Sequence, residues 1–139
     1  MSQIVKKYYE IIVVDDVKSI CNSIRREISI ALHNRIDIGF RITDFQNPKT
    51  GMEYILNNNL DLLISDIKMP FISGEKLVEA VKREKPTLPI IVITGFATKE
   101  NIISINHSDP NSIILSKPWE PPRLIHAISK LLDVHLRWD

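Results

Sequence analysis

The sequence predicts one α/β domain, built on a doubly wound parallel sheet of five strands with helices on both faces. Five short apolar runs rich in Ile, Val and Leu recur along the chain, with helix-like segments between them. Continuous apolar runs are typical of strands buried on both faces. Strands that alternate with helices indicate a parallel sheet covered on both sides. The 139 residues, 44% of them apolar, suffice for one hydrophobic core.

The strands are predicted from these runs alone. They cover residues 11–14, 38–42, 62–64, 90–93 and 113–115, of which the second is the weakest. Because parallel strands joined by right-handed crossovers admit few topologies, the order of the strands is strongly restricted.

The first helix is predicted between the first two strands. Its apolar side carries residues at helical spacing, and its other side is polar. The apolar positions are Ile20, Ile24, Ile28, Ala31 and Leu32, and the polar ones are Arg25, Arg26 and Glu27.

Four further helices follow. They are predicted at 50–56, at 74–83 with Ser73 as N-cap, at 99–106, and from Pro121 to about residue 132. The helix at 99–106 is the weakest of the four, because Ile102, Ile103 and Ile105 are β-branched.

Composition excludes several classes of protein. The formal net charge of +1 gives no general attraction to nucleic acid or to anionic membranes. No apolar run approaches the length of a membrane span, and the first residues lack the apolar centre of a signal peptide. The single cysteine, Cys21, is expected to be a buried structural thiol in a reducing compartment. We therefore expect a cytoplasmic protein.

Polar side chains follow four of the five predicted strands. Asp15 and Asp16 follow the first, Asp66 the third, Thr94 the fourth, and Lys117 the fifth. Because ligands of doubly wound sheets bind beyond the carboxyl ends of the strands, we expect these groups to converge on one rim. Each residue alone has a structural explanation, as a helix cap, a turn residue or a solvated charge. Their joint occurrence points to a site.

Three clustered carboxylates predict a cation. Like charges about 4 Å apart repel by roughly 1 to 4 kcal/mol per pair. Oxygen ligands without Cys or His select a hard ion, and Mg²⁺ typically takes one or two carboxylates together with water and phosphate oxygens. The four histidines, His33, His107, His126 and His135, show no metal-ligand spacing.

Four segments together resemble the receiver domains of two-component response regulators. They are VVDD, LLISDIKMPFISGEKLV, PIIVITGFAT and IILSKPW, in that order from Ile11 to about Leu132. Each fragment is weak alone, but the ordered set of acidic pair, D-x-x-M-P-x-x-x-G, T-G-F-A and K-P-W is specific. The last motif resembles a subgroup of receivers that end in K-P-W.

The resemblance implies a flavodoxin-like strand order of 2, 1, 3, 4, 5 and a role for each matching residue. Asp66 matches the phosphoacceptor, and Asp15, Asp16, Asp66 and the backbone carbonyl of Lys68 match the Mg²⁺ ligands. Thr94 matches the switch hydroxyl and Lys117 the lysine that pairs with the phosphoryl group. Lys68, Gly95, Phe96 and Pro118 are expected to border the site.

The resemblance also implies function and partners. The expected function is a phosphorylation-dependent signalling switch that catalyses only its own aspartyl phosphorylation and dephosphorylation. The phosphoryl donor would be a sensor histidine kinase or a phosphotransfer protein, and small phosphoryl donors often substitute. A downstream protein or an output domain outside this chain would read the switch. Dimerisation, where it occurs in the family, often uses the fourth helix, fifth strand and fifth helix.

One position departs from the family pattern. Ile114 stands where an aromatic residue usually changes rotamer on activation, so we expect the output face to respond through the loop after Thr94. Lys68 and Phe96 beside the phosphoryl group would slow its hydrolysis if they hindered water. The domain is predicted to cover residues 1–139, with its core at about 9–133 and a tail or linker stub at 134–139.

Two alternatives stay open at this point. The chain would be a receiver-like interaction module if it were never phosphorylated, although such domains typically lose an acidic residue or the lysine. A haloacid-dehalogenase-type phosphohydrolase also uses a strand-end aspartate, Mg²⁺, a threonine and a lysine. That family places its aspartates as Asp-x-Asp on the first strand, whereas Asp15 and Asp16 are adjacent. A P-loop is excluded because no G-x-x-x-x-G-K stretch exists.

Overall fold

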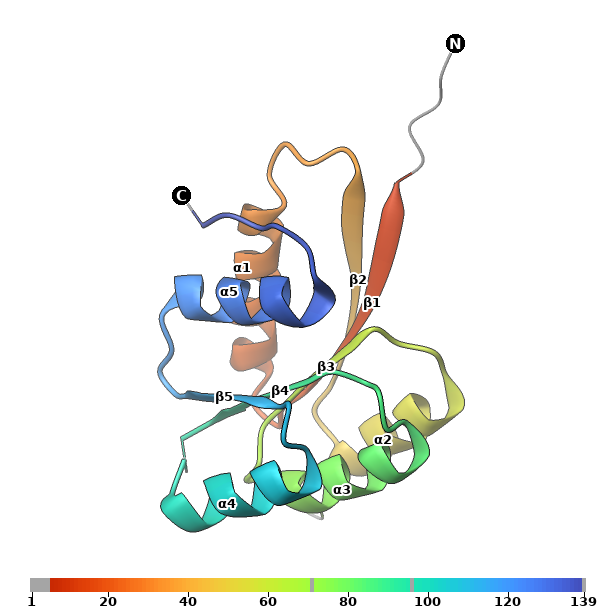
Figure 1. The fold of residues 1–139 in the computed structure, drawn as a ribbon, viewed down its shortest axis with the longest axis vertical. Coiled ribbons are helices and arrows are strands. Elements are labelled where there is room, and N and C mark those ends of the chain that lie inside the picture. The colour runs from red at the N-terminus through yellow and green to blue at the C-terminus, as the bar shows by residue number, and fades with distance from the viewer. Residues whose placement is uncertain (1–5, 71, 96, 139) are drawn as a thin grey trace.

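Five parallel strands form an open sheet with helices on both faces (Figure 1). The computed structural model describes residues 6–70, 72–95 and 97–138. The strand order is β2-β1-β3-β4-β5, which confirms the predicted fold class and order. The strands are β1 (Lys7–Val14), β2 (Ile38–Phe45), β3 (Leu62–Ser65), β4 (Ile90–Thr94) and β5 (Ile113–Ser116). The helices are α1 (Lys18–Ala31), α2 (Pro48–Asn57), α3 (Gly74–Glu84), α4 (Lys99–Ser108) and α5 (Pro121–Leu132).

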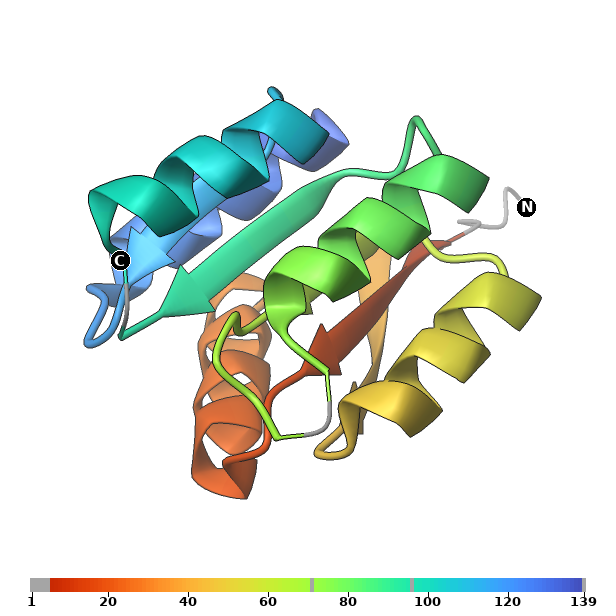
Figure 2. The ribbon, with the colours of Figure 1, turned by 90° about the horizontal axis from the view of Figure 1, so that it is seen from below.

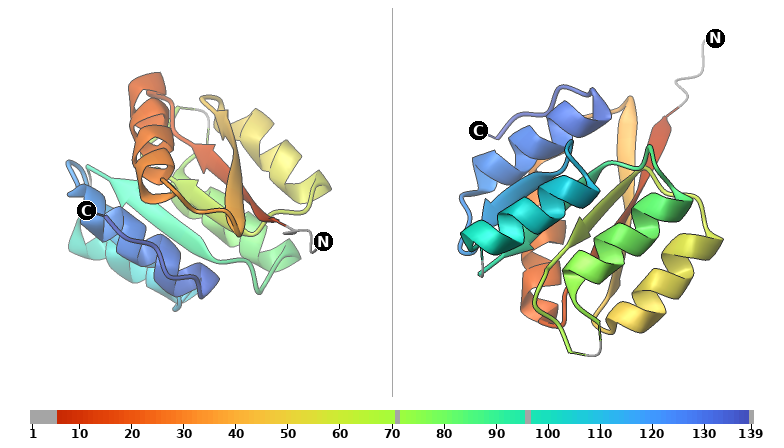
Figure 3. Two further views of the ribbon diagram at one scale, coloured as in Figure 1. Left: turned by 90° about the horizontal axis from the view of Figure 1, so that it is seen from above. Right: turned by 60° about the horizontal axis from the view of Figure 1, so that its bottom comes forward.

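The helices divide into two layers, as Figures 2 and 3 show. Helices α1 and α5 cover one face of the sheet, and α2, α3 and α4 cover the other. Strand β1 contributes to both layers, because alternate side chains point to opposite faces. Ile11 and Val13 pack with α1 and α5, whereas Ile12 and Val14 pack with α2 and α3. The uninterrupted apolar run in β1 is explained by this burial on both faces.

Strands β1 and β2 are longer than predicted. Residues 7–10 of β1 pair only with β2, since the pairing of β1 with β3 starts at Ile11 opposite Leu62. This extension is a mixture of polar and aromatic residues, and Tyr8 remains 43% exposed. It carries no apolar run from which a strand would be predicted, and its strand conformation depends on pairing with β2.

Helix α1 confirms the predicted apolar stripe and contradicts one polar assignment. Ile24, Ile28 and Ala31 are buried, as is Cys21. Glu27 was placed on the polar side by its residue type, and this is wrong, because it is buried with only 6% of its surface exposed. Its carboxylate accepts a hydrogen bond from the indole of Trp119, and this partner is 92 residues away in sequence.

Two helix starts illustrate how local sequence sets the boundaries. Ser73 caps α3 as predicted, and its hydroxyl accepts a hydrogen bond from the amide of Lys76. Helix α2 begins two residues earlier than predicted, at Pro48, with Asn47 as its cap. Proline suits the first helical position because its missing N–H has no partner in that turn.

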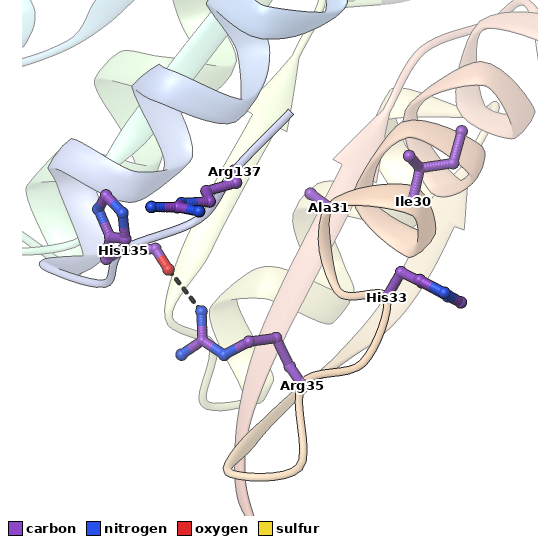
Figure 4. A pocket seen from close by; sticks show the side chains of 6 residues that line it. All are labelled: Ile30, Ala31, His33, Arg35, His135 and Arg137. Carbon is purple, nitrogen blue, oxygen red and sulfur yellow. Dashed lines mark hydrogen bonds between the residues drawn. The ribbon is translucent and has the colours of Figure 1, made fainter. Parts of the chain in front are cut away.

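The chain after α5 returns to the core. It turns at Asp133, which has a left-handed backbone, and buries Leu136 against the α1 and α5 layer. The core therefore includes a residue beyond position 133. The guanidinium of Arg35 donates to the carbonyl of His135 across a pocket at the end of α1, as Figure 4 shows. This pocket lies near the amino-terminal ends of the strands, at the other end of the sheet from their carboxyl ends.

None of the helices in the described part of the chain combines the length and apolar composition that a membrane crossing requires.

Candidate functional site

The predicted polar residues lie at the carboxyl ends of their strands. Asp15 follows β1, Asp66 follows β3, Thr94 ends β4, and Lys117 follows β5. The parallel register aligns these ends, with Val14 beside Ser65 and Thr94 beside Ser116. The backbone amide of Lys117 also donates to the carbonyl of Thr94 at 2.8 Å. The sheet itself therefore gathers residues that are far apart in sequence.

Lys117 joins the two buried aspartates. Its Nζ lies 2.7 Å from Oδ2 of Asp15 and 2.9 Å from Oδ2 of Asp66. The side chains of both aspartates are almost fully buried, and that of Lys117 is 19% exposed. One ammonium thus lies between two carboxylates.

Backbone amides hold the other oxygen of each aspartate. Oδ1 of Asp15 accepts from the amide of Val17 at 2.9 Å, and Oδ1 of Asp66 accepts from the amide of Ile67 at 2.6 Å. Each carboxylate is therefore fixed at both oxygens, one by the chain that follows its strand and one by Lys117. Such charge-assisted bonds fix the orientation of both carboxylates.

Burial and charge act against each other at this site. Burial raises the pKa of Asp15 above its usual range and outweighs the opposing bonds from Lys117 and Val17. Burial also acts to lower the pKa of Lys117, but the bonds to Asp15 and Asp66 outweigh it and raise that pKa. Lys117 is therefore held in its cationic form between the two carboxyl groups.

The acidic group fits a hard cation. Asp15, Asp16 and Asp66 each offer a carboxylate oxygen, and these oxygens lie within 4.8 Å of one another. Asp16 is exposed while the other two are buried, so the group opens to solvent on one side. An oxygen donor set with access to water suits Mg²⁺, which keeps several water ligands.

The remaining predicted residues differ in exposure. Thr94 is fully buried at the end of β4. Lys68, Gly95 and Pro118 are exposed around the rim. Phe96 was predicted to border the site and lies outside the described residues.

Gly74 is the last residue of the D-x-x-M-P-x-x-x-G motif, and its structural role follows from its contact with the Asp66 segment. A Cβ at this position would lie 2.1 Å from the carbonyl oxygen of Asp66 and 2.5 Å from Cα of Ile67. The amide of Gly74 also donates to the carbonyl of Ile67 at 2.6 Å. The start of α3 therefore packs directly on the backbone that carries Asp66, and only glycine permits this approach.

Residues 11–129 match the family described as the response regulator receiver domain. The chain belongs to this family. The match covers both buried aspartates, the lysine between them and all five strands except the start of β1. Receiver domains are signalling domains.

Two solved structures show how closely this receiver domain follows the fold. A CheY-like receiver domain from Methanospirillum hungatei is 26% identical, with a TM-score of 0.80 over 93% of this chain and 95% of that one. The response regulator TrrA from Thermotoga maritima, solved in complex with Mg²⁺ and BeF, is 25% identical, with a TM-score of 0.72 over 89% and 99% of the two chains.

Curated relatives of different lengths include two response regulators and a hydrogenase transcriptional regulatory protein. CpdR of Brucella abortus is 32% identical over 114 residues, which cover 80% of this chain and 89% of that protein. SaeR of Staphylococcus aureus is 28% identical over 68% of this chain, and HoxA of Cupriavidus necator is 27% identical over 74%. The matched residues span only 40% of SaeR and 21% of HoxA.

Proposed function

We propose that this receiver domain is a phosphorylation-dependent switch in which Asp66 accepts the phosphoryl group. The observation that carries the proposal is the position of Asp66: its Oδ2 lies 2.9 Å from the Lys117 ammonium and its carboxylate belongs to the acidic group of Asp15 and Asp16. A carboxylate attacks phosphorus well only when charge on the phosphoryl oxygens is neutralised. Asp66, the predicted phosphoacceptor, lies beside two groups that would neutralise this charge: the Lys117 ammonium and a cation held by the acidic group.

The transfer follows from these contacts. An oxygen of Asp66 attacks the phosphorus of a phosphohistidine on a kinase or phosphotransfer protein. The P–O bond forms, the P–N bond breaks, and the histidine leaves. Asp15, Asp16, Asp66 and the carbonyl of Lys68 would hold Mg²⁺, which neutralises charge on the phosphoryl oxygens when bound. Lys117 then exchanges one aspartate oxygen for a phosphoryl oxygen, and Thr94 binds another.

The same contacts supply energy for switching. Moving an equilibrium from 1:99 to 99:1 takes about 5.5 kcal/mol. Charge-assisted bonds contribute roughly 1.5 to 3 kcal/mol each, so those from Lys117 and Thr94 would provide most of it. The change would pass to the loop after Thr94, with Ile114 in place of the usual aromatic switch.

The partners follow from the chemistry. A phosphohistidine donor implies a sensor histidine kinase or phosphotransfer protein, and we expect a cytoplasmic setting. The relatives that are longer than this chain support an output carried outside the receiver domain. The structure of TrrA, which was solved in complex with Mg²⁺ and BeF, supports Mg²⁺ binding by this receiver domain.

The test is the mass of the intact protein after incubation with Mg²⁺ and acetyl phosphate. We expect one phosphoryl group on the parent and none on Asp66→Asn. Chelation of Mg²⁺ should abolish the addition. An unmodified parent, or the same addition on Asp66→Asn, would overturn the proposal and favour an interaction module that is never phosphorylated.

A further inference from the structure

The loop that joins Lys117 to α5 is short and consists of Pro118, Trp119 and Glu120. Pro118 has no N–H to donate, whereas the amide of Lys117 is held at the sheet by the carbonyl of Thr94. Lys117, whose ammonium lies between Asp15 and Asp66, directly precedes this loop. The sheet fixes the backbone of Lys117 on one side, and the contacts of this loop fix the chain on the other.

The side chain of Trp119 anchors the loop to α1. Its Nε1 donates to Oε1 of Glu27 at 2.7 Å, and its ring packs against the apolar layer formed by α1 and α5. Glu27 is buried, with 6% of its surface exposed. A buried carboxylate is unfavourable unless a donor satisfies it, so this residue is difficult to explain as packing alone.

The same two segments meet at a second point. Helix α1 begins just after Asp15 and Asp16, and Asp15 bonds to Lys117 at 2.7 Å. Glu27 lies farther along the same helix and bonds to Trp119, two residues after Lys117. Two interactions therefore join the α1 segment to the chain around the β5–α5 loop. One is the ion pair of Asp15 with Lys117, and the other is the hydrogen bond from the Trp119 indole to the buried carboxylate of Glu27.

We propose that Glu27 is a positioning residue: by accepting the hydrogen bond of Trp119, it fixes the β5–α5 loop and so places the Lys117 ammonium between Asp15 and Asp66. This placement of Lys117 concerns the unphosphorylated protein. The effect of the placement on phosphoryl transfer rests on the proposed function. The burial that raises the pKa of Glu27, against the bond from Trp119, agrees with an acceptor enclosed in the core.

The first test is the nitrogen-15 NMR signal of the Lys117 ammonium, assigned with Lys117→Arg. This signal is visible when hydrogen bonds protect the ammonium protons from exchange. Glu27→Met keeps the bulk of the side chain but removes the acceptor, and we expect it to broaden or shift the signal. Glu27→Gln retains an acceptor oxygen, and we expect it to preserve the signal.

Ile28→Val is the matched control for lost packing. It removes one methyl group from a buried side chain of α1 and keeps both partners of the Glu27–Trp119 hydrogen bond, so it should leave the ammonium signal in place. If Glu27→Met does not fold, Trp119→Phe tests the same bond from the donor side. An unchanged Lys117 signal in the folded variant that lacks the bond would overturn the proposal, whether or not the parent is phosphorylated.

The second test is the rate of phosphorylation by acetyl phosphate. Displacements of about 1 Å away from the reacting atoms lower rates by up to about 100-fold, so we expect about a tenfold loss in Glu27→Met and near-parent rates in Glu27→Gln and Ile28→Val. Equal rates in Glu27→Met and the parent would contradict the positioning role and leave the proposed function intact. Failure of the parent to react would overturn only the proposed function.

Discussion

The position of each residue at this site depends on its neighbours as well as on its own chemistry. Asp66 is the proposed phosphoacceptor, and its position depends on Gly74, where a Cβ would lie 2.1 Å from the Asp66 carbonyl oxygen. Asp15 and Lys117 likewise depend on each other, because each is the main charged partner of the other at 2.7 Å. Two predictions belong to this scale.

The first prediction concerns Gly74→Ala. The added methyl group would overlap the backbone of Asp66 and Ile67, so α3 or the Asp66 segment must move. We expect a loss of about 1–3 kcal/mol in the free energy of unfolding, measured by denaturant titration, together with slower phosphorylation. Gly95→Ala is the control, since a Cβ there meets nothing within 4 Å. Equal stability of both variants would contradict the assigned contact.

The second prediction concerns Asp44 and pH. Burial acts to raise the pKa of Asp44, but hydrogen bonds from Lys18, Arg25 and Gln46 outweigh it and lower the pKa to about 2. A depressed pKa stabilises the fold above the usual value near 4, and this contribution is lost as pH falls toward 2. Asp44→Asn should therefore lose about 1–2 kcal/mol at pH 7, with less difference from the parent near pH 2. Denaturation at several pH values measures this, and a pH-independent difference would count against it.

At the scale of elements, α4 shows packing that overrides propensity. Its β-branched isoleucines favour a helix poorly, but Thr98 caps it by accepting from the amide of Asn101. Ile105 is buried against α3 and β4 residues, whereas Ile103 is 59% exposed. Ile105 is therefore the fully buried side chain with which α4 packs on the core.

The third prediction compares these two isoleucines. Ile105→Ala should lower the free energy of unfolding by about 2–4 kcal/mol, because it leaves a cavity in the core. Ile103→Ala should be neutral or slightly stabilising, because alanine favours the helix and little burial is lost. Thermal or chemical denaturation gives both values. Comparable losses in the two variants would show that α4 packs differently.

At the scale of the whole molecule, topology creates the charge cluster. The strand order brings β1 and β3 side by side, so Asp15 and Asp66 become neighbours although 51 residues separate them. The repulsion among the three carboxylates is relieved only in part by Lys117. A cation that binds the folded chain should therefore stabilise it.

The fourth prediction is a rise in stability with Mg²⁺. A ligand at 100 times its Kd stabilises the folded state by about 2.7 kcal/mol, and we expect a shift of this order in the parent. Asp16→Asn should lose most of the effect, since it removes the exposed carboxylate of the proposed metal site without disturbing a buried group. Glu120→Gln, which changes the same charge at another exposed position, should keep it. A shift retained in Asp16→Asn would place the cation elsewhere.

Most of the fold followed from local patterns in the sequence. Apolar runs located the five strands, most clearly the central strands β3 and β4, because strands buried on both faces require apolar residues at successive positions. The extra residues 7–10 of β1 escaped prediction, because their strand conformation comes from pairing with β2 and not from their own composition. Glu27 was misplaced for a related reason: its residue type predicts exposure, and its partner Trp119 lies across the fold.

By itself the sequence determined the fold class and the identity of the polar residues at the strand ends, because strand burial and turn chemistry are local and periodic. Tertiary structure alone decided which of these residues meet. It placed Lys117 between Asp15 and Asp66, gave Gly74 its contact with Asp66, and joined Glu27 to Trp119. Contacts between distant segments depend on strand order and register, and no short stretch of sequence encodes either one.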